Sequence, residues 1–540
     1  MKTEKFNLSM KWYISRKPYD NYDDYDWYYL NLVKKVYGLL GGEGLKKHLG
    51  LTKVEVRELA FILVSYFEDI ICEIGIWETI VKSHRKLYGK PLPLLPVRED
   101  KYMDGDLNTE DVLFLIWFFI SSFKEDTLHA PNNYLLRVLS SDIAELFENE
   151  YEEAPAIDLY DDYFKIKDTD GYFEVRSKLQ WMAFNSYIFG YELNKYYDSL
   201  MGEIFKDKKI TEVTFQMANP YVNEQSIYKR HTKWSALRAV DFFAEMVNTS
   251  DTCKQSIKKL SNKHTGKYYF RGEDDTYFFF ENVSTGVNYN VLKDSYGSTE
   301  GINNGKVFDV SFIKWNNEWH ISGSSITTDD DEGKLKEWKF KNQHLLYDYD
   351  EGYRQKVLDM QKDNYSDFME SFNEDLVFFK SYDELNQKIK DYYNYINTKR
   401  AKEKSIGKKD IPEFTKDIDL PMPQRKLNDY CLFYNPDSGI EIAFHVKRFL
   451  QKLKDISGDA PREEDIFFVF DFIQSDSISA ALILELKKRY DLSGIGALYQ
   501  LRDFDVDNEL DFLLRMHKPQ DYADKNPNIS LVDRGELPSS

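Results

Sequence analysis

Apolar residues in the first half of the chain recur with the spacing of buried helix faces. Tyr29, Leu32, Val36 and Leu40 follow the i, i+3, i+7 rhythm, and the glycine pair that begins at Gly41 marks the end of that helix. The apolar run 112–120 is too short for the roughly 20 residues of a bilayer span, so it predicts a buried helix. By the same criteria we predict further helices over 54–81 with a break near Gly75, from Asn108 through the apolar run, over 175–205 and over 224–247.

The pattern changes near Lys267, where short aromatic and β-branched runs alternate with turn residues. Five strands are predicted there, in KYYFRG, TYFFFEN, GVNYNVLK, KVFDVSFIKW and EWHISGSS. A two-residue turn at Asn316-Asn317 places one set of side chains on one face, namely Phe308, Val310, Phe312, Trp319 and Ile321. The other face then holds Ile313, Trp315, Glu318 and His320. A three-residue loop would instead pair Trp315 with Trp319.

Helix signals return after this module, and a second pair of strands follows a lysine-rich stretch. Residues 381–384 form a capping box in front of an apolar helix face, and CLFYNPDSGIEIAF predicts two strands around a turn. The predicted fold class is therefore α+β, mostly helical and multidomain, with a central small antiparallel β-module and a C-terminal α+β region. The predicted parts are an N-terminal helical domain at 1–150, a second helical region at 151–262, the β-module at 263–328, a helical region at 329–398, a basic proline-containing linker at 399–428 and the C-terminal region at 429–540.

The amino-acid composition indicates the cellular compartment of the protein and the classes of partner that it can bind. The 540 residues carry 72 Lys and Arg against 92 Asp and Glu, a net charge of −20, which disfavours general nucleic-acid binding. Three widely spaced cysteines are typical of a reducing compartment, and no signal peptide or membrane span is apparent. We therefore expect a cytoplasmic protein with protein partners and no membrane association.

Strong catalytic and cofactor motifs are absent, so we expect no cofactor and no metal. The Gly42-Glu43-Gly44 and Gly494-Ile495-Gly496 segments lack the third glycine of a dinucleotide fingerprint. The loop from Asp104 lacks the glycine and glutamate of a calcium site. Three further pairs of residues have the spacing of a catalytic or metal-binding motif, but the sequence shows no additional residues that would complete such a site. They are Ser256 with Lys259, Glu125 with His129, and Glu441 with His445.

Two sets of residues stay as candidates for function. Trp315, Glu318 and His320 could form a partner-binding patch, the alternative being that another domain covers Trp315. Asp69, Glu73 and His84 could converge between helices as the acid and base groups of a hydrolase, although two carboxylates four residues apart more often border a solvated edge. The catalytic residues are otherwise unknown. The basic residues from Lys399 to Lys409 have no interleaved aromatics and predict a solvated linker.

Three stretches together resemble a bacterial family known only as a domain of unknown function. They are KPYDNYDDYDWYYLNLVKKVY, then FENVSTGVNYNVLKDS with VSFIKWNNEWHISG, and finally FYNPDSGIEIAF with ELDFLLRMHKPQDY. The resemblance implies a bacterial, multidomain protein, extends over most of the chain and assigns no role to any residue.

The leading hypothesis is a non-catalytic protein-binding or regulatory protein. A hydrolase whose site is assembled from residues remote in sequence is the alternative, and an acidic mimic of nucleic acid is a third possibility. The first rests on the missing catalytic constellation and the acidic balance of the chain.

Overall fold

The computed structural model divides into two compact units. It describes residues 8–42, 48–124, 127–206, 210–296, 305–329, 331–403, 413–458 and 461–523. The first unit runs to Leu345 and regains Leu498–Ala523, whereas the second comprises Leu346–Ala497. The chain therefore leaves the first unit and later returns to it. These two units are a coarser division than the predicted regions, whose boundaries stay predictions.

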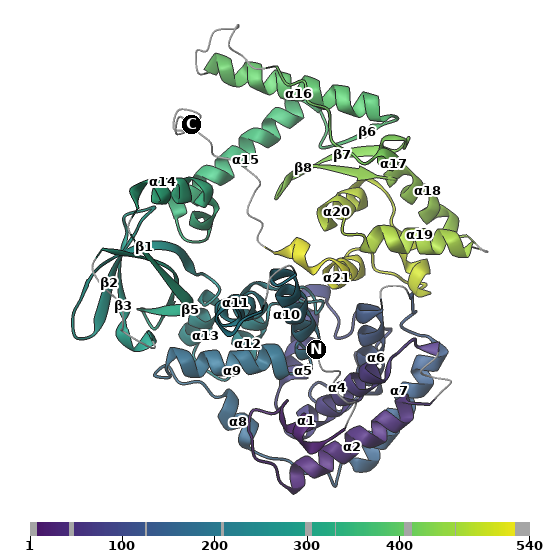
Figure 1. Ribbon diagram of the computed structural model, residues 1–540. Coiled ribbons are helices and arrows are strands. Elements are labelled where there is room, and N and C mark those ends of the chain that lie inside the picture. Colours follow the sequence, from purple (N-terminus) through teal and green to yellow (C-terminus); the bar gives the residue numbers. More distant parts are fainter. Residues whose placement is uncertain are drawn as a thin grey trace. The chain divides into compact units, whose positions relative to one another are not determined.

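Helices build most of the first unit, and a β-barrel lies beside the later ones (Figure 1). The helices before the barrel are α1 (Met10–Ile14), α2 (Asp24–Leu40), α4 (Lys53–Ile71), α5 (Ile76–Tyr88), α6 (Thr109–Phe123), α7 (Tyr134–Glu150), α8 (Leu159–Phe164), α9 (Tyr172–Asn185), α10 (Gly190–Ile204), α11 (Glu212–Glu224), the π-helix Gln225–Lys229, α12 (Ala239–Met246) and α13 (Asp251–Lys259). The elements after the barrel are α14 (Glu332–Lys341), α21 (Asn508–His517) and the short 3-10 turn Pro519–Tyr522.

The core of this unit surrounds α4 and α6. Every residue from Glu55 to Ile70 of α4 is buried, as is every residue from Asp111 to Ser122 of α6, which confirms the buried helix predicted from the apolar run. The predicted break at Gly75 is also confirmed, because α4 ends at Ile71 and α5 begins at Ile76. None of the helices in the described ranges combines the length and the apolar character needed to cross a membrane.

The helix predicted over 175–205 is two helices. α9 ends at Asn185 and α10 begins at Gly190. The Ser186 hydroxyl donates to the carbonyl oxygen of Met182 at 2.6 Å and accepts from the backbone N–H of Phe189 at 3.2 Å. A serine that bonds to nearby backbone groups competes with the helical ladder, which accounts for the interruption.

The prediction of one continuous helix over 224–247 is wrong for the middle of that range. The π-helix ends at Lys229, and helical structure resumes only at Ala239. Ser235 and Ala236 between them have positive φ angles of 51° and 57°, which no right-handed helix contains. Trp234 is nevertheless buried and donates its indole N–H to the carbonyl oxygen of Ile188 at 2.7 Å. The side chain is therefore well packed although the backbone around it is not helical.

The β-module is a closed barrel with strand order β1-β2-β3-β5-β4, and all five predicted strands are present. The strands are β1 (His264–Glu273), β2 (Tyr277–Asn282), β3 (Asn288–Leu292), β4 (Lys306–Trp315) and β5 (Glu318–Asp329). All pairings are antiparallel except the one that closes the barrel, between Val291 of β3 and Trp319 of β5. Aromatic and β-branched side chains fill its interior.

The β4–β5 turn has the two-residue form. Trp315 pairs with Glu318, and Asn316 and Asn317 between them have φ angles of 47° and 67°. The inward face contains Phe308, Val310, Phe312 and Ile321, with Trp319 packed against them, as that turn predicts. The three-residue loop is thereby excluded.

The second unit holds a three-stranded antiparallel sheet with order β6-β7-β8. Its elements are α15 (Glu351–Phe372), β6 (Leu376–Phe379), α16 (Tyr382–Glu403), α17 (Met422–Arg425), β7 (Tyr430–Asn435), β8 (Gly439–Phe444), α18 (Val446–Ile456), α19 (Glu463–Gln474) and α20 (Ala480–Arg489), with the 3-10 segment Ser493–Tyr499 at its end. The two predicted strands are β7 and β8, whereas β6 was missed. α16 continues through the first residues of the predicted linker, of which 404–412 lie outside the described residues.

The returning segment is bonded firmly to the rest of the first unit. Glu509, at the start of α21, is buried and accepts from the Lys90 ammonium at 2.6 Å and from the backbone N–H of Leu94 at 3.2 Å. Its other oxygen accepts from the backbone N–H of Asp505 at 2.9 Å. α21 therefore completes the helical unit, although it is last in the sequence.

The β4–β5 turn of the barrel can be tested by substitution, because Asn317 has a positive φ angle. Replacing Asn317 by glycine should raise the free energy of unfolding slightly, whereas valine should lower it by roughly 1–3 kcal/mol because a β-branched residue is strained in the left-handed region. Urea unfolding of the full chain, followed by circular dichroism, measures both. A valine variant as stable as the wild type would contradict this account of the turn.

Candidate functional site

Asp69 lies at the end of α4 and caps the next helix. Its carboxylate accepts from the backbone N–H groups of Gly75, Ile76 and Trp77 at 2.8, 3.2 and 2.6 Å, and from the hydroxyl of Tyr187 at 2.6 Å. The first N–H groups of a helix have no partner within the helix, so the carboxylate satisfies those of α5. Burial raises the pKa of Asp69 to about 6, against the lowering effect of these hydrogen bonds.

The other two members of the predicted hydrolase trio lie elsewhere. Glu73 is exposed in the turn after α4, with a φ of 50°. His84 is 1% exposed, with its Nδ1 2.8 Å from the carbonyl oxygen of Pro91, and burial lowers its pKa to about 4, so the imidazole is neutral. It lies about 12 Å along α5 from the helix end that Asp69 caps. The structure does not bring these three side chains together.

The predicted partner-binding residues surround a covered tryptophan. Trp315 is 2% exposed, and its indole N–H donates to the carbonyl oxygen of Asp170 at 2.9 Å. Of the two alternatives for Trp315, the structure thus has the one in which another part of the chain covers the side chain. Glu318 accepts from the hydroxyl of Tyr277 at 3.3 Å. The ring of His320 lies 5.3 Å from that of Tyr172, and burial lowers its pKa. A partner-binding role for these residues stays a prediction, without an exposed tryptophan at its centre.

Residues of two of the motif-like pairs form hydrogen bonds with nearby residues. Glu441 accepts from Asn435, Ser438 and Ser479, while His445 precedes α18 with a φ of 64°. Ser256 donates to the carbonyl oxygen of Thr252 one turn earlier in α13.

The remaining motifs add no site. Asp104 pairs with Arg85 at 2.8 Å, and Gly494-Ile495-Gly496 lies in a 3-10 segment. Glu125 and the Glu43-Gly44 dipeptide lie outside the described residues. Within the described ranges, no three His, Cys, Asp or Glu side chains are arranged to hold a metal ion.

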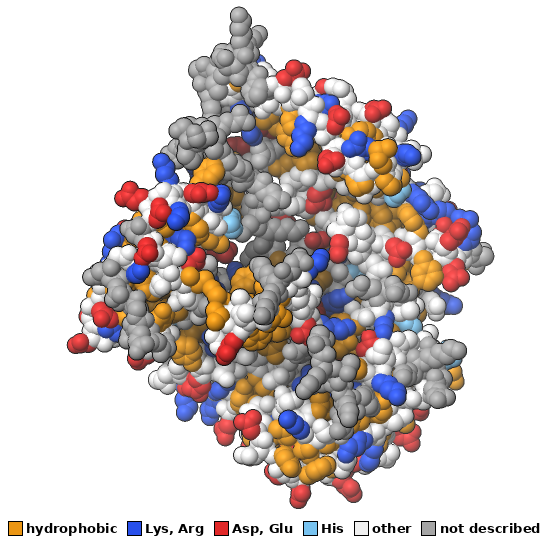
Figure 2. Space-filling model, viewed as in Figure 1, with side chains coloured by type: hydrophobic (Ala, Val, Ile, Leu, Met, Phe, Trp, Pro, Cys, Tyr) orange, Lys and Arg blue, Asp and Glu red, His pale blue; other side chains and the backbone are white. Residues whose placement is uncertain are grey.

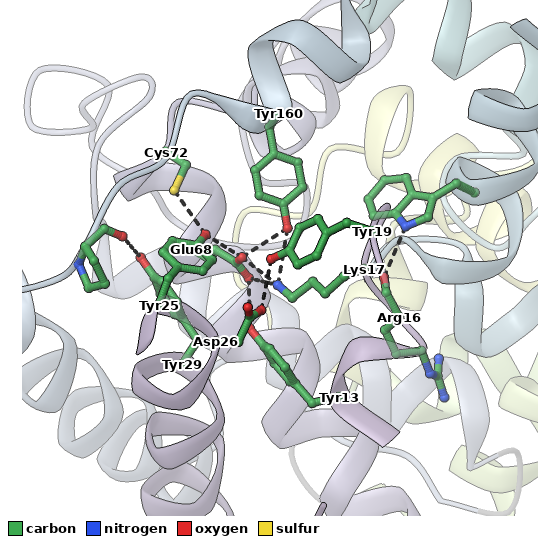
Figure 3. A network of polar contacts seen from close by, with 12 residues as sticks. Tyr13, Arg16, Lys17, Tyr19, Tyr25, Asp26, Tyr29, Glu68, Cys72 and Tyr160 are labelled. Carbon is green, nitrogen blue, oxygen red and sulfur yellow. Dashed lines mark hydrogen bonds and ion pairs between the residues drawn. The ribbon is translucent and has the colours of Figure 1, made fainter. Parts of the chain in front are cut away.

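A buried ion pair between Lys17 and Glu68 was not anticipated, and it lies at the centre of the network of polar contacts drawn in Figure 3. The side chains of the two residues are 3% and 2% exposed. Glu68, on α4, also accepts from the hydroxyls of Tyr25 at 2.6 Å and Tyr160 at 3.0 Å. The Lys17 ammonium donates to the Tyr160 hydroxyl at 3.2 Å and lies 4.6 Å from the centre of the Tyr13 ring. A buried carboxylate with this many donors is electrostatically satisfied.

The network ends in a cysteine that is not activated. The hydroxyl of Tyr25 lies 3.3 Å from the sulfur of Cys72, and burial raises the pKa of the thiol. A thiol with a raised pKa is a poor nucleophile, so this contact is structural. The sequence signal that could have revealed the network is the consecutive pair Glu68-Asp69 directly after the mostly apolar run 59–67.

Beside the network lies a cleft of about 590 Å³ with an almost uncharged lining. Lys17 and the loop after it form one side, and the rest comes from α9, α10 and α11 together with Tyr163 of α8. Amide side chains dominate its polar surface, namely Gln180, Asn185, Asn194, Asn219 and Asn223. Aromatic rings supply the apolar surface, namely Tyr19, Tyr163, Trp181, Phe184 and Tyr197.

A second cleft, of about 970 Å³, has a different character. It lies among α5, α8 and α12 and is lined by many charged side chains, some already paired, as Lys82 is with Glu78 and Lys258 with Glu245. No histidine is among the described residues that line it. The two clefts thus differ in the kind of molecule they suit.

α11 also carries an apolar stripe that faces solvent. Val213, Met217 and Tyr221, spaced four residues apart, are 65%, 43% and 52% exposed, and Ile210 just before the helix is 63% exposed. On the face shown in Figure 2, hydrophobic side chains gather where Figure 1 places α10 and α11. Contiguous exposed apolar side chains on one helix face are typical of interaction surfaces.

Breaking the central ion pair should be costly. Replacing Lys17 by methionine should lower the free energy of unfolding by roughly 3–5 kcal/mol, because it leaves the buried Glu68 carboxylate without its cation. Adding Glu68→Gln to that variant should restore much of the loss. A double-mutant cycle in urea measures both effects, and two losses that simply add would contradict the coupling.

The cap at Asp69 predicts a pH dependence of stability. With a folded pKa of about 6 against 3.8 when unfolded, the folded state holds a proton that the unfolded state releases. The free energy of unfolding should therefore fall as the pH rises from about 4 to 6, by at most about 1.4 kcal/mol per pH unit. Asp69→Asn should remove this slope while lowering stability at every pH. Glu73→Gln, which removes an exposed carboxyl from the following turn, is the matched control.

Comparison with known proteins found a similarity for the part of the chain that contains these features. The comparison with curated proteins and the comparison with solved structures each found no match. A family model matches residues 8–268, a segment that includes the Lys17–Glu68 network, both clefts and α11. The match ends at the start of the barrel, so it is narrower than the resemblance predicted from the sequence. Residues 8–268, a little under half of the chain, are similar to the family described as protein of unknown function (DUF3843).

Proposed function

We propose that this is a non-catalytic protein-binding or regulatory protein, and that its partner docks on the exposed stripe of α11. The observation that carries the proposal is the outward orientation of Val213, Met217 and Tyr221. A helix normally turns such residues toward the core. Here only Val222 and Glu224 of the helix are buried.

Glu224 holds α11 in this orientation. Its carboxylate pairs with the ammonium of Lys263 and accepts from the Ser322 hydroxyl at 2.5 Å, both of which are buried. Rotating the helix to bury the apolar stripe would carry Glu224 away from these partners and leave Lys263 unpaired, which is costly. The exposed stripe is thus a fixed feature of the fold.

The partners of the candidate acid and base groups favour binding over hydrolysis. Asp69 caps α5, Glu68 pairs with Lys17, and His84 bonds a carbonyl oxygen. Each of these groups thus has a partner that gives it a structural role. A binding role requires no such group.

The proposal places the protein in the cytoplasm of a bacterium. Cys72, Cys253 and Cys431 are all buried and unpaired, as suits a reducing compartment. The bacterial origin rests on the resemblance of the sequence alone.

The stripe can be tested by substitution. Serine at positions 213, 217 and 221 should reduce capture of a partner at least ten-fold, because truncating a buried interface anchor costs about 2 kcal/mol or more. The measurement is affinity capture with the full chain, followed by cross-linking and mass spectrometry to locate the contact.

Tyr134→Ser is the matched control, since Tyr134 is 82% exposed on α7, away from the stripe. Partners retained by the triple variant, or contacts that map away from α11, would contradict the proposal. So would turnover of a substrate by purified protein that captures no partner.

A further inference from the structure

The amides of α11 that line the smaller cleft are fixed in orientation. Asn219 Oδ1 accepts from the hydroxyl of Tyr197 at 2.6 Å and from Asn223 Nδ2 at 3.2 Å. Both lone pairs of that oxygen are therefore used, whereas the Nδ2 donors of Asn219 and the Oδ1 acceptor of Asn223 are left for a ligand. The two positions offer a donor beside an acceptor.

Two further amides extend this surface along α9. Gln180 and Asn185 line the cleft, and their side-chain amides make no hydrogen bond to any part of the chain that the structure describes. Each carries both donors and an acceptor. Hydroxyl groups both donate and accept, so a row of amides is suited to a ligand that carries several of them.

The aromatic rings of the cleft are held in place as well. Trp181 donates its indole N–H to the carbonyl oxygen of Arg16 at 3.1 Å, a contact drawn in Figure 3, and packs edge-on against Tyr163 at 5.8 Å. Phe184 packs edge-on against Tyr197 at 6.0 Å. Rings that are already ordered lose little conformational entropy when a ligand covers them. They give the cleft apolar walls beside its amides.

Charge separates this cleft from the larger one. Among the residues that the structure describes, Lys17 and Asp20 are the formally charged residues of its lining. The ammonium of Lys17 is buried and neutralised by Glu68, and Asp20 is exposed. An anionic ligand would therefore find no uncompensated cation in the lining, and its desolvation would cost more than the site returns.

From these features we propose that the cleft among α9, α10 and α11 binds a neutral polyhydroxylated ligand, namely a saccharide. The amides bond its hydroxyls, and the aromatic rings cover the apolar C–H faces of its sugar rings. The cleft volume of about 590 Å³ lies within the usual range for small-molecule sites. The site is distinct from the apolar stripe of α11, so it does not depend on the protein-binding role.

The test is titration of the full chain with defined probes. Maltotriose, cellotriose and chitotriose are the neutral probes, trigalacturonic acid is the charged probe, and adenosine is the aromatic probe. We expect at least one neutral trisaccharide to bind, with a change in tryptophan fluorescence from Trp181, and the charged and aromatic probes not to bind. Calorimetry gives the dissociation constants.

Two variants locate the binding. Asn219→Asp keeps the acceptor for Tyr197 and Asn223 but removes the donor, so it should weaken binding at least ten-fold. Gln180→Ala removes an exposed amide that has no internal bond within the described residues, and it should weaken binding several-fold without affecting folding. Asn31→Asp, which adds the same charge at an exposed position of α2, should leave binding unchanged.

Three results would overturn the proposal. The first is that none of the neutral trisaccharides binds. The second is binding that neither cleft variant weakens, because the ligand then lies elsewhere. The third is binding of adenosine or of trigalacturonic acid in place of the neutral sugars, which would assign the cleft to another ligand class.

Discussion

The burial of one carboxylate, that of Glu68, organises the N-terminal part of this protein. A charge held away from water is tolerated only when it is paired and hydrogen-bonded. The groups that satisfy Glu68 come from separate segments, namely Lys17 after α1, Tyr25 on α2 and Tyr160 on α8. Their convergence fixes these segments around α4. It also positions the backbone of Arg16, to which Trp181 bonds, so one wall of the amide-lined cleft depends on the same charge.

Regular elements with a strong local pattern could be predicted from the sequence. The buried helix α6, the break at Gly75, the five barrel strands and the two-asparagine turn all follow from periodicity and turn chemistry. The interruptions could not be predicted in this way. Ser186 divides a helix through side-chain bonds to its own backbone, and Ser235 and Ala236 adopt left-handed angles within a well-packed segment. Tertiary contacts prevail over local preference at such positions.

The candidate site was less accessible to sequence reasoning than the fold. Asp69 was singled out for its chemistry, but its role is to cap α5, a relation that depends on how the chain turns after α4. Glu68 was passed over because its partners lie 43 to 92 residues away along the chain. The amide-lined cleft draws its side chains from five segments, namely the loop after α1 and the helices α8, α9, α10 and α11, and none of those segments carries a motif by itself. Spatial convergence of ordinary residues leaves little trace in a single sequence.

The return of α21 to the first unit has a consequence for synthesis of the chain. The buried Glu509 that bonds Lys90 and Leu94 is translated only after the whole of Leu346–Ala497. The ribosome therefore releases the later unit while the earlier one still lacks its final helix. Domains usually fold in the order in which they emerge. In this protein the part made first is completed only by the part made last.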